Sequence, residues 1–182
     1  MAIRSGTKHF WLLTLVFLTA ASSLFSQTTS QQPKPSQPGS VMQQIASTKL
    51  TINYSRPVAR GRELFGKLVP YGTIWNPGAN DATSITISTP ITVNGQSLAA
   101  GSYTIWANPG PDQWTWIFSK AHPVFHVPYP GVDKDALRLT VKPRAASHME
   151  TMAYYFSVVD GRKAELVLHW GTVAVPLEII VP

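Results

Sequence analysis

Residues 103–118 read YTIWANPGPDQWTWIF, and this stretch decides the fold class. Residues 103–106 and 114–118 alternate side chains of different polarity, the two-residue period of a strand with one buried face. Proline, glycine and aspartate at 109–112 form a turn signal between the two runs. The stretch therefore predicts two β-strands separated by a turn.

The same period continues on both sides of this stretch. It recurs in residues 50–55, 85–88, 137–142, 152–158, 165–170 and 173–181. Asn94-Gly95 is a strong hairpin signal because both central positions of such a turn need a positive φ, and Gly171-Thr172 predicts a turn between the last two strands. No stretch sustains a 3.6-residue apolar period. The sequence therefore predicts an all-β protein, an antiparallel, jelly-roll-like β-sandwich with one long crossover loop.

The N-terminal residues have the features of a secretory signal peptide. Arg4 and Lys8 precede the apolar run 10–21, and small residues follow it. The run is shorter than the roughly 20 residues that a membrane-spanning helix needs. We expect a signal peptide over 1–26, cleaved after Ser26 or, alternatively, after Ser23, and no stable membrane span after its removal. An uncleaved anchor is the other reading.

The chain after the signal peptide divides into two parts. Residues 27–40 are rich in proline, glutamine and serine and contain no large apolar side chain, so they predict a flexible tether. Residues 41–182 predict a single domain. The sequence thus predicts an exported protein, periplasmic or extracellular, that is a monomer or a weak dimer formed through strand edges.

Composition excludes several classes of function. The 182 residues include no cysteine, which excludes disulfide frameworks, thiolate metal sites and thiol catalysis. The net charge of +6 falls to +4 when Arg4 and Lys8 leave with the signal peptide. The remaining basic residues form no long stripe, so the sequence does not predict binding to nucleic acid.

One long segment carries a family resemblance. Residues 54–72 read YSRPVARGRELFGKLVPYG, and residues 74–83 read IWNPGANDAT. Together with later stretches they resemble a bacterial family of exported proteins, domain of unknown function 2911, over roughly residues 41–182. Two departures from the family pattern stand out. Asn76 occupies the place after Trp75 where the family usually has arginine, and residues 122–135 differ from the commoner form.

The same segment contains the densest set of polar side chains. It holds the candidate ligand-binding residues Arg56, Arg60, Arg62, Asn76 and Asn80. A connection of this length without clear secondary structure is often functional, and guanidinium groups bind carboxylates and phosphates through paired hydrogen bonds. The segment predicts a module that binds a small polar, anionic or glycan-like ligand, or an envelope protein. The alternative is structural, since a long loop needs donors for its backbone carbonyls.

The tryptophans predict two different environments. Trp114, Trp116 and Phe118 share one face of a strand, so they predict core packing. Trp106 is out of phase with Tyr103 on its own strand. The phase predicts that Trp106 is exposed and available to a ligand.

Histidine and glutamate side chains offer a candidate metal site. His148 and Glu150 share one face of a predicted strand, and the third ligand is His169 or His122, which gives a metal-assisted hydrolase as an alternative function. No established zinc spacing, nucleophile elbow or paired-carboxylate pattern is present. The sequence therefore predicts no cofactor and does not indicate an enzyme. A purely structural envelope protein is the remaining alternative.

Overall fold

A computed structural model describes residues 2 and 32–182, so the signal-peptide prediction lies outside the described residues. Residues 33–182 form one compact unit. Its elements are β1 (Gln37–Ile45), β2 (Thr48–Arg56), β3 (Ser84–Ile87), β4 (Ile91–Val93), β5 (Gln96–Leu98), β6 (Gly101–Asn108), β7 (Trp114–Ser119), the 3₁₀ helix η1 (Val132–Lys134), β8 (Asp135–Val141), β9 (Arg144–Asp160) and β10 (Lys163–Ile180). Nowhere in the described part is there a helix long and apolar enough to cross a membrane.

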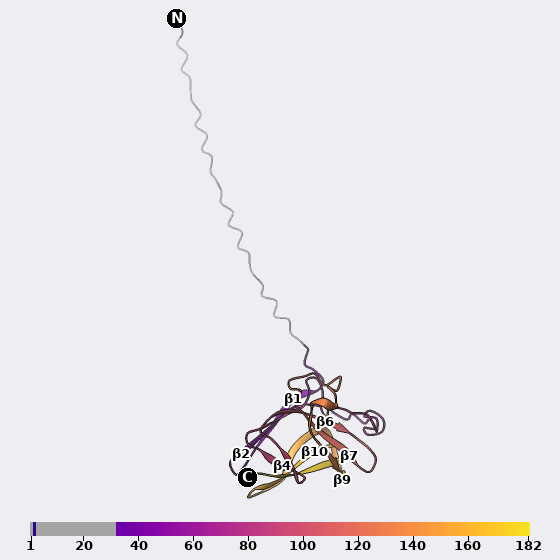
Figure 1. Ribbon diagram of the computed structural model, residues 1–182. Helices are drawn as coiled ribbons and strands as arrows, with labels where there is room; N and C mark the ends of the chain where they lie inside the picture. The colour runs from indigo at the N-terminus through magenta and orange to yellow at the C-terminus, as the bar shows by residue number, and fades with distance from the viewer. Residues whose placement is uncertain (1, 3–31) are drawn as a thin grey trace. The chain divides into compact units, whose positions relative to one another are not determined.

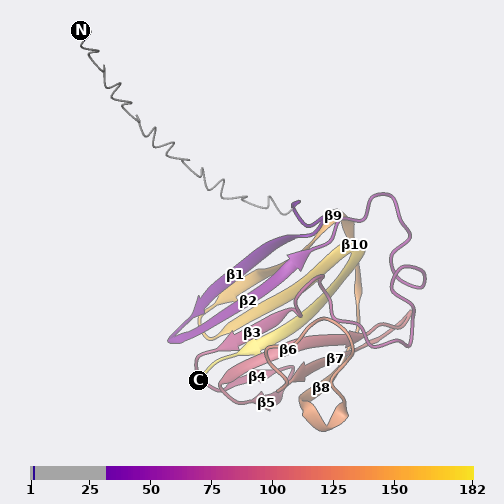
Figure 2. The ribbon, with the colours of Figure 1, turned by 90° about the horizontal axis from the view of Figure 1, so that it is seen from above.

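The strands form two antiparallel sheets. One sheet has six strands in the order β1-β2-β3-β6-β7-β8, and the other has four in the order β5-β4-β10-β9. Figures 1 and 2 show the sheets as two layers. Leu50 and Ile52 of β2 and Leu168 of β10 belong to the buried cluster between the layers. This arrangement confirms the predicted antiparallel β-sandwich.

The aromatic residues of β7 lie in the core, as the sequence predicts. Trp114, Trp116 and Phe118 are all buried and belong to the main hydrophobic cluster. The indole N–H of Trp116 has no hydrogen-bond partner among the described residues. The predicted hairpin at Asn94-Gly95 is also present, with φ of 46° and 79° at its central residues.

The sheet begins earlier than the sequence predicts. Strand β1 starts at Gln37, inside the predicted tether 27–40, and Gln37 pairs with Arg56 of β2. The composition of residues 37–40 argued against burial. However, strand pairing needs only backbone groups, and Gly39 lies close to the side chains of Arg56 and Tyr54. The domain therefore begins at least four residues before the predicted boundary.

The predicted turn at Gly171-Thr172 is wrong. Strand β10 runs through both residues, and the register with β9 shifts on either side of Gly171. Gly171 has a φ of 58°, and because β10 continues through it with register shifts on both sides, this conformation forms a bulge here and not a chain reversal. The two strands predicted at the C-terminal end are thus one bent strand.

Replacing Gly171 with alanine is expected to lower the free energy of unfolding by about 2 kcal/mol. The added Cβ would lie 2.7 Å from Cδ1 of the buried Leu64, and the φ of 58° is unfavourable for alanine. Urea unfolding measures this effect. Gly161→Ala is the control, because Gly161 has a φ of 56° but nothing within 4 Å of a Cβ. Equal losses in the two variants would contradict the predicted clash.

The long connection between β2 and β3 covers one end of the sandwich. It joins neighbouring strands of the same sheet, so it is not a crossover between sheets. It nevertheless touches both layers, because Val58 pairs with Thr151 of β9 and Trp75 pairs with Ala107 of β6. Figure 2 shows this purple connection extending beyond the strand ends. Its position brings the predicted ligand-binding segment to one end of the domain.

Candidate functional site

Two of the three candidate arginines hold the loop in place. The Arg56 Nε donates a hydrogen bond to the Met152 carbonyl of β9 at 3.1 Å. The Arg62 guanidinium donates to the carbonyls of Ala59 at 2.8 Å and Val58 at 2.6 Å. These bonds satisfy backbone acceptors, which is the structural role that the sequence left open as an alternative.

The two candidate asparagines also bind backbone. Asn76 is 1% exposed, and its amide donates to the Ile105 carbonyl at 2.7 Å and accepts from the Thr83 N–H at 3.0 Å. Asn80 donates to the Ser36 carbonyl at 3.0 Å. An amide both donates and accepts, whereas a guanidinium only donates. Asn76 therefore makes a contact, acceptance of the Thr83 N–H, that an arginine at this position could not make.

Arg60 differs from the other candidates. Its backbone N–H donates to the Glu150 carboxylate at 2.5 Å, but its guanidinium has no hydrogen bond or ion pair within the described residues. The residue is exposed and has a φ of 53°, in the left-handed region that non-glycine residues seldom adopt. The loop thus fixes the backbone of Arg60 and leaves its charged group in solvent.

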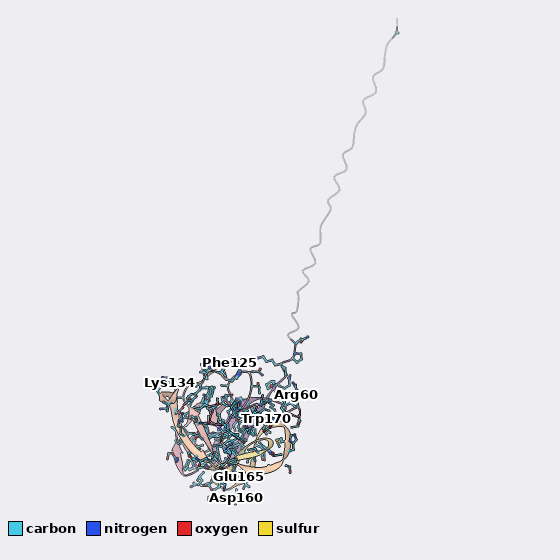
Figure 3. All side chains as sticks on the ribbon, turned by 90° about the vertical axis from the view of Figure 1, so that its right-hand side faces the viewer. Arg60, Phe125, Lys134, Asp160, Glu165 and Trp170 are labelled. Carbon is cyan, nitrogen blue, oxygen red and sulfur yellow. The ribbon has the colours of Figure 1, made fainter. Side chains whose placement is uncertain are left out.

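A groove lies beside Arg60. Its volume is about 370 Å³, and its lining includes Arg60, Arg62, His126, Trp75 and Trp170. The two tryptophan rings stack with centroids 6.2 Å apart and planes at 18°. In Figure 3, Arg60 lies toward the end of the domain opposite Asp160 and Glu165. No aspartate or glutamate lines the groove, so it combines a cationic rim with an aromatic floor.

One residue of the segment 120–131, His126, lines the groove. The His126 ring is hydrogen-bonded through Nδ1 to the Asn80 carbonyl, and Phe125 pairs with Asp81. These contacts join the segment 120–131 to the β2–β3 connection. The departure at 122–135 from the family pattern therefore includes one residue of the groove lining, His126.

The structure corrects the prediction for Trp106. The side chain is 1% exposed, its Nε1 donates to the Thr104 hydroxyl at 2.9 Å, and its ring lies 5.4 Å from the ring of Tyr129. Trp106 does face away from the sandwich core, as its phase predicts, but the segment 120–134 covers it there. Trp106 is therefore not an exposed platform for a ligand and does not line the groove.

The candidate metal ligands come together only in part. The His148 Nε2 lies 2.9 Å from a Glu150 carboxylate oxygen. His169 is 6% exposed and uses its two ring nitrogens on the Tyr155 hydroxyl at 3.2 Å and the Ser147 carbonyl at 2.9 Å. Across residues 32–182, no three histidine, aspartate or glutamate side chains are grouped to hold a metal ion.

Glu150 connects His148 to the backbone of Arg60 at the groove, and this connection depends on pH. Hydrogen bonds from His148 and from the Arg60 N–H hold the pKa of Glu150 below its ordinary value. The hydrogen bonds to the ionised Glu150 therefore stabilise the folded protein fully above the ordinary pKa range of glutamate. This stabilisation is lost as the pH falls through the lowered pKa of Glu150. We expect the Arg60 amide resonance to titrate in NMR spectra with a midpoint below the ordinary pKa range of glutamate. In Glu150→Gln this titration should disappear, and its persistence would contradict the assignment.

A family model described as "Protein of unknown function (DUF2911)" matches residues 36–179. The match includes strands of both sheets and every residue named above as lining the groove. No curated protein and no solved structure matches the chain.

Proposed function

The chain belongs to the DUF2911 family of unknown function, and we propose from the geometry of the groove that it is a binding module for a small organic anion. The features of residues 1–26 support export to the periplasm or the extracellular space. Binding is assigned to the groove between the β2–β3 connection and His126.

The Arg60 guanidinium is the observation that carries this proposal. It makes no hydrogen bond or ion pair with the described residues, and the carboxylate of Glu150, which accepts from the Arg60 N–H, lies outside the groove lining. A guanidinium binds a carboxylate or phosphate through two parallel, charge-assisted hydrogen bonds. The backbone bond from Arg60 to Glu150 limits the freedom of the loop before a ligand arrives.

The floor of the groove suits the apolar body of such a ligand. Trp75 is half-buried, and Leu68 and Val69 lie beside it in the lining. The volume of about 370 Å³ is at the small end of the range of about 300–1,000 Å³ that is typical of small-molecule sites. The groove therefore suits a compact anion with an aromatic or aliphatic body.

Benzoate and phenyl phosphate test the proposal as anionic probes, with benzyl alcohol as the neutral control. Arg60→Ala should weaken anion binding, measured by calorimetry, by roughly 10- to 100-fold, because a hydrogen bond to a charged group contributes about 1.5–3 kcal/mol. The melting temperature should change little, since a φ of 53° is as unfavourable for alanine as it is for arginine.

Arg162→Ala is the matched control for charge, because Arg162 is exposed in the turn between β9 and β10 and does not line the groove. It should bind the anions as the original protein does. The proposal fails if neither anion binds saturably, if benzyl alcohol binds equally well, or if Arg60→Ala retains full affinity.

A further inference from the structure

A row of small polar side chains crosses the outer face of the six-stranded sheet. Ser40 of β1 is paired with Asn53 of β2, Asn53 with Ser84 of β3, and Ser84 with Thr104 of β6. Residues directly opposite in antiparallel strands share a face of the sheet, and neighbouring strands lie about 4.8 Å apart. The four side chains therefore form one line perpendicular to the strands.

Three members of this row have unused hydrogen-bonding groups. Thr104 accepts from the Trp106 indole and donates to the Ala121 carbonyl. The side chains of Ser40, Asn53 and Ser84, in contrast, make no hydrogen bond within residues 32–182. Ser84 is only 8% exposed. Its hydroxyl nevertheless stays accessible, since the Trp116 Nε1 is the one fully buried side-chain polar atom without a partner in the described part of the chain. Water or a ligand can therefore reach the Ser84 hydroxyl.

Three members of the row, Ser40, Asn53 and Ser84, line a cleft. The cleft has a volume of about 590 Å³, and its wall is made by Asp81, Ala82 and residues 122–124. The two parts of the wall are joined, because the Ala82 N–H donates a hydrogen bond to the Val124 carbonyl. The cleft shares no lining residue with the Arg60 groove, so it is a separate site.

The lining of the cleft is mostly apolar with several hydrogen-bonding groups, and it fits a neutral ligand that carries both C–H surface and hydroxyl groups. No lysine or arginine lines the cleft, and its ionisable side chains other than the tyrosine are Asp81 and His122. Serine hydroxyls and the Asn53 amide can each donate and accept, which matches the hydroxyl groups of a sugar. Pro38, Pro123 and Val124 add apolar surface for its C–H groups.

We propose that this cleft binds a neutral saccharide, with Asn53 at the centre of the polar row and Ser40 and Ser84 on either side. Asp81 accepts a hydrogen bond from a sugar hydroxyl at the wall. The size of the cleft is within the range of about 300–1,000 Å³ for small-molecule sites. This site does not depend on the anion site, and each can fail without the other.

NMR titration with maltose, cellobiose, lactose and di-N-acetylchitobiose tests the proposal. At least one disaccharide should produce saturable shifts at the backbone amides of Ser40 and Ser84 and at the Asn53 side-chain amide. Asn53→Ala should weaken this binding by about tenfold, the effect of losing the donor and the acceptor of one amide. Folding should be unaffected, because the Asn53 side chain makes no hydrogen bond within the described residues.

Thr51→Ala is the matched control, since Thr51 lies on the same face of β2 two residues away and does not line the cleft. This variant should keep the affinity of the original protein. The proposal is overturned if none of the four disaccharides gives saturable shifts, if the shifts lie elsewhere, or if Asn53→Ala binds as tightly as Thr51→Ala. Titration with benzoate separates the sites, because benzoate should shift the Arg60 groove and leave the Asn53 amide unchanged.

Discussion

Replacing Trp106 with alanine is expected to lower the free energy of unfolding by about 4 kcal/mol, the range typical of a large buried aromatic side chain. The ring fills the space between β6 and the segment 120–134, where it packs against Tyr129. The Tyr129 hydroxyl in turn donates to Asp135, and Arg138 donates to both residues. The cavity left by the Trp106 ring would therefore weaken the packing that holds the segment 120–134 on β6. Denaturant unfolding followed by circular dichroism measures the loss.

Two tryptophan-to-phenylalanine variants separate packing from hydrogen bonding. Trp106→Phe removes the same atoms as Trp116→Phe, and both side chains are almost completely buried. Only Trp106 loses a hydrogen bond, because the Trp116 indole has no partner among the described residues. Trp106→Phe should therefore cost about 1 kcal/mol more than Trp116→Phe. The reverse order would contradict the role given to the Thr104 bond.

Replacing Asn76 with alanine is expected to cost about 3 kcal/mol, because it leaves two buried backbone groups without partners at about 1–3 kcal/mol each. The amide bridges the Ile105 carbonyl of β6 and the Thr83 N–H at the end of the long connection. No water can easily replace it, since the side chain is almost fully buried. Urea unfolding measures the loss.

Asn53→Ala is the matched control for this substitution. It makes the same chemical change at an exposed position of β2, where the amide has no hydrogen bond to the described part of the chain. Its free energy of unfolding should stay within about 0.5 kcal/mol of the original value, as for ordinary surface substitutions. A loss for Asn76→Ala no larger than this would show that its two hydrogen bonds do not hold the loop.

The sheet architecture could be predicted because it depends on local patterns. The period of two put Trp114, Trp116 and Phe118 on the inward face, and the two positive φ angles of a hairpin explain Asn94-Gly95. Gly171 shows the limit of such patterns. Glycine allows a positive φ in a turn and in a bulge alike, and only pairing with β9 determines which of them forms.

The candidate site could be predicted as a segment but not residue by residue. Arg56 and Arg62 are bound because backbone carbonyls of β9 and of the loop itself lie within reach, and those positions depend on the folded chain. The predicted exposure of Trp106 is wrong for a related reason. Phase tells which face of a sheet a residue occupies, but it does not reveal that a distant segment covers that face. The cleft at Asn53 gave no sequence signal, because its polar row forms only when β1, β2 and β3 pair.

The β2–β3 connection, which is fastened to β9 through Val58 and to β6 through Trp75, has a consequence for recognition. A lid that closes over a ligand needs a free edge and hinges, whereas this segment is paired with both layers near its two ends. Under the proposed function, the groove would bind an anion with little ordering entropy left to lose. Ligands should be discriminated by their fit to an existing shape, and association should be a single step without a conformational change.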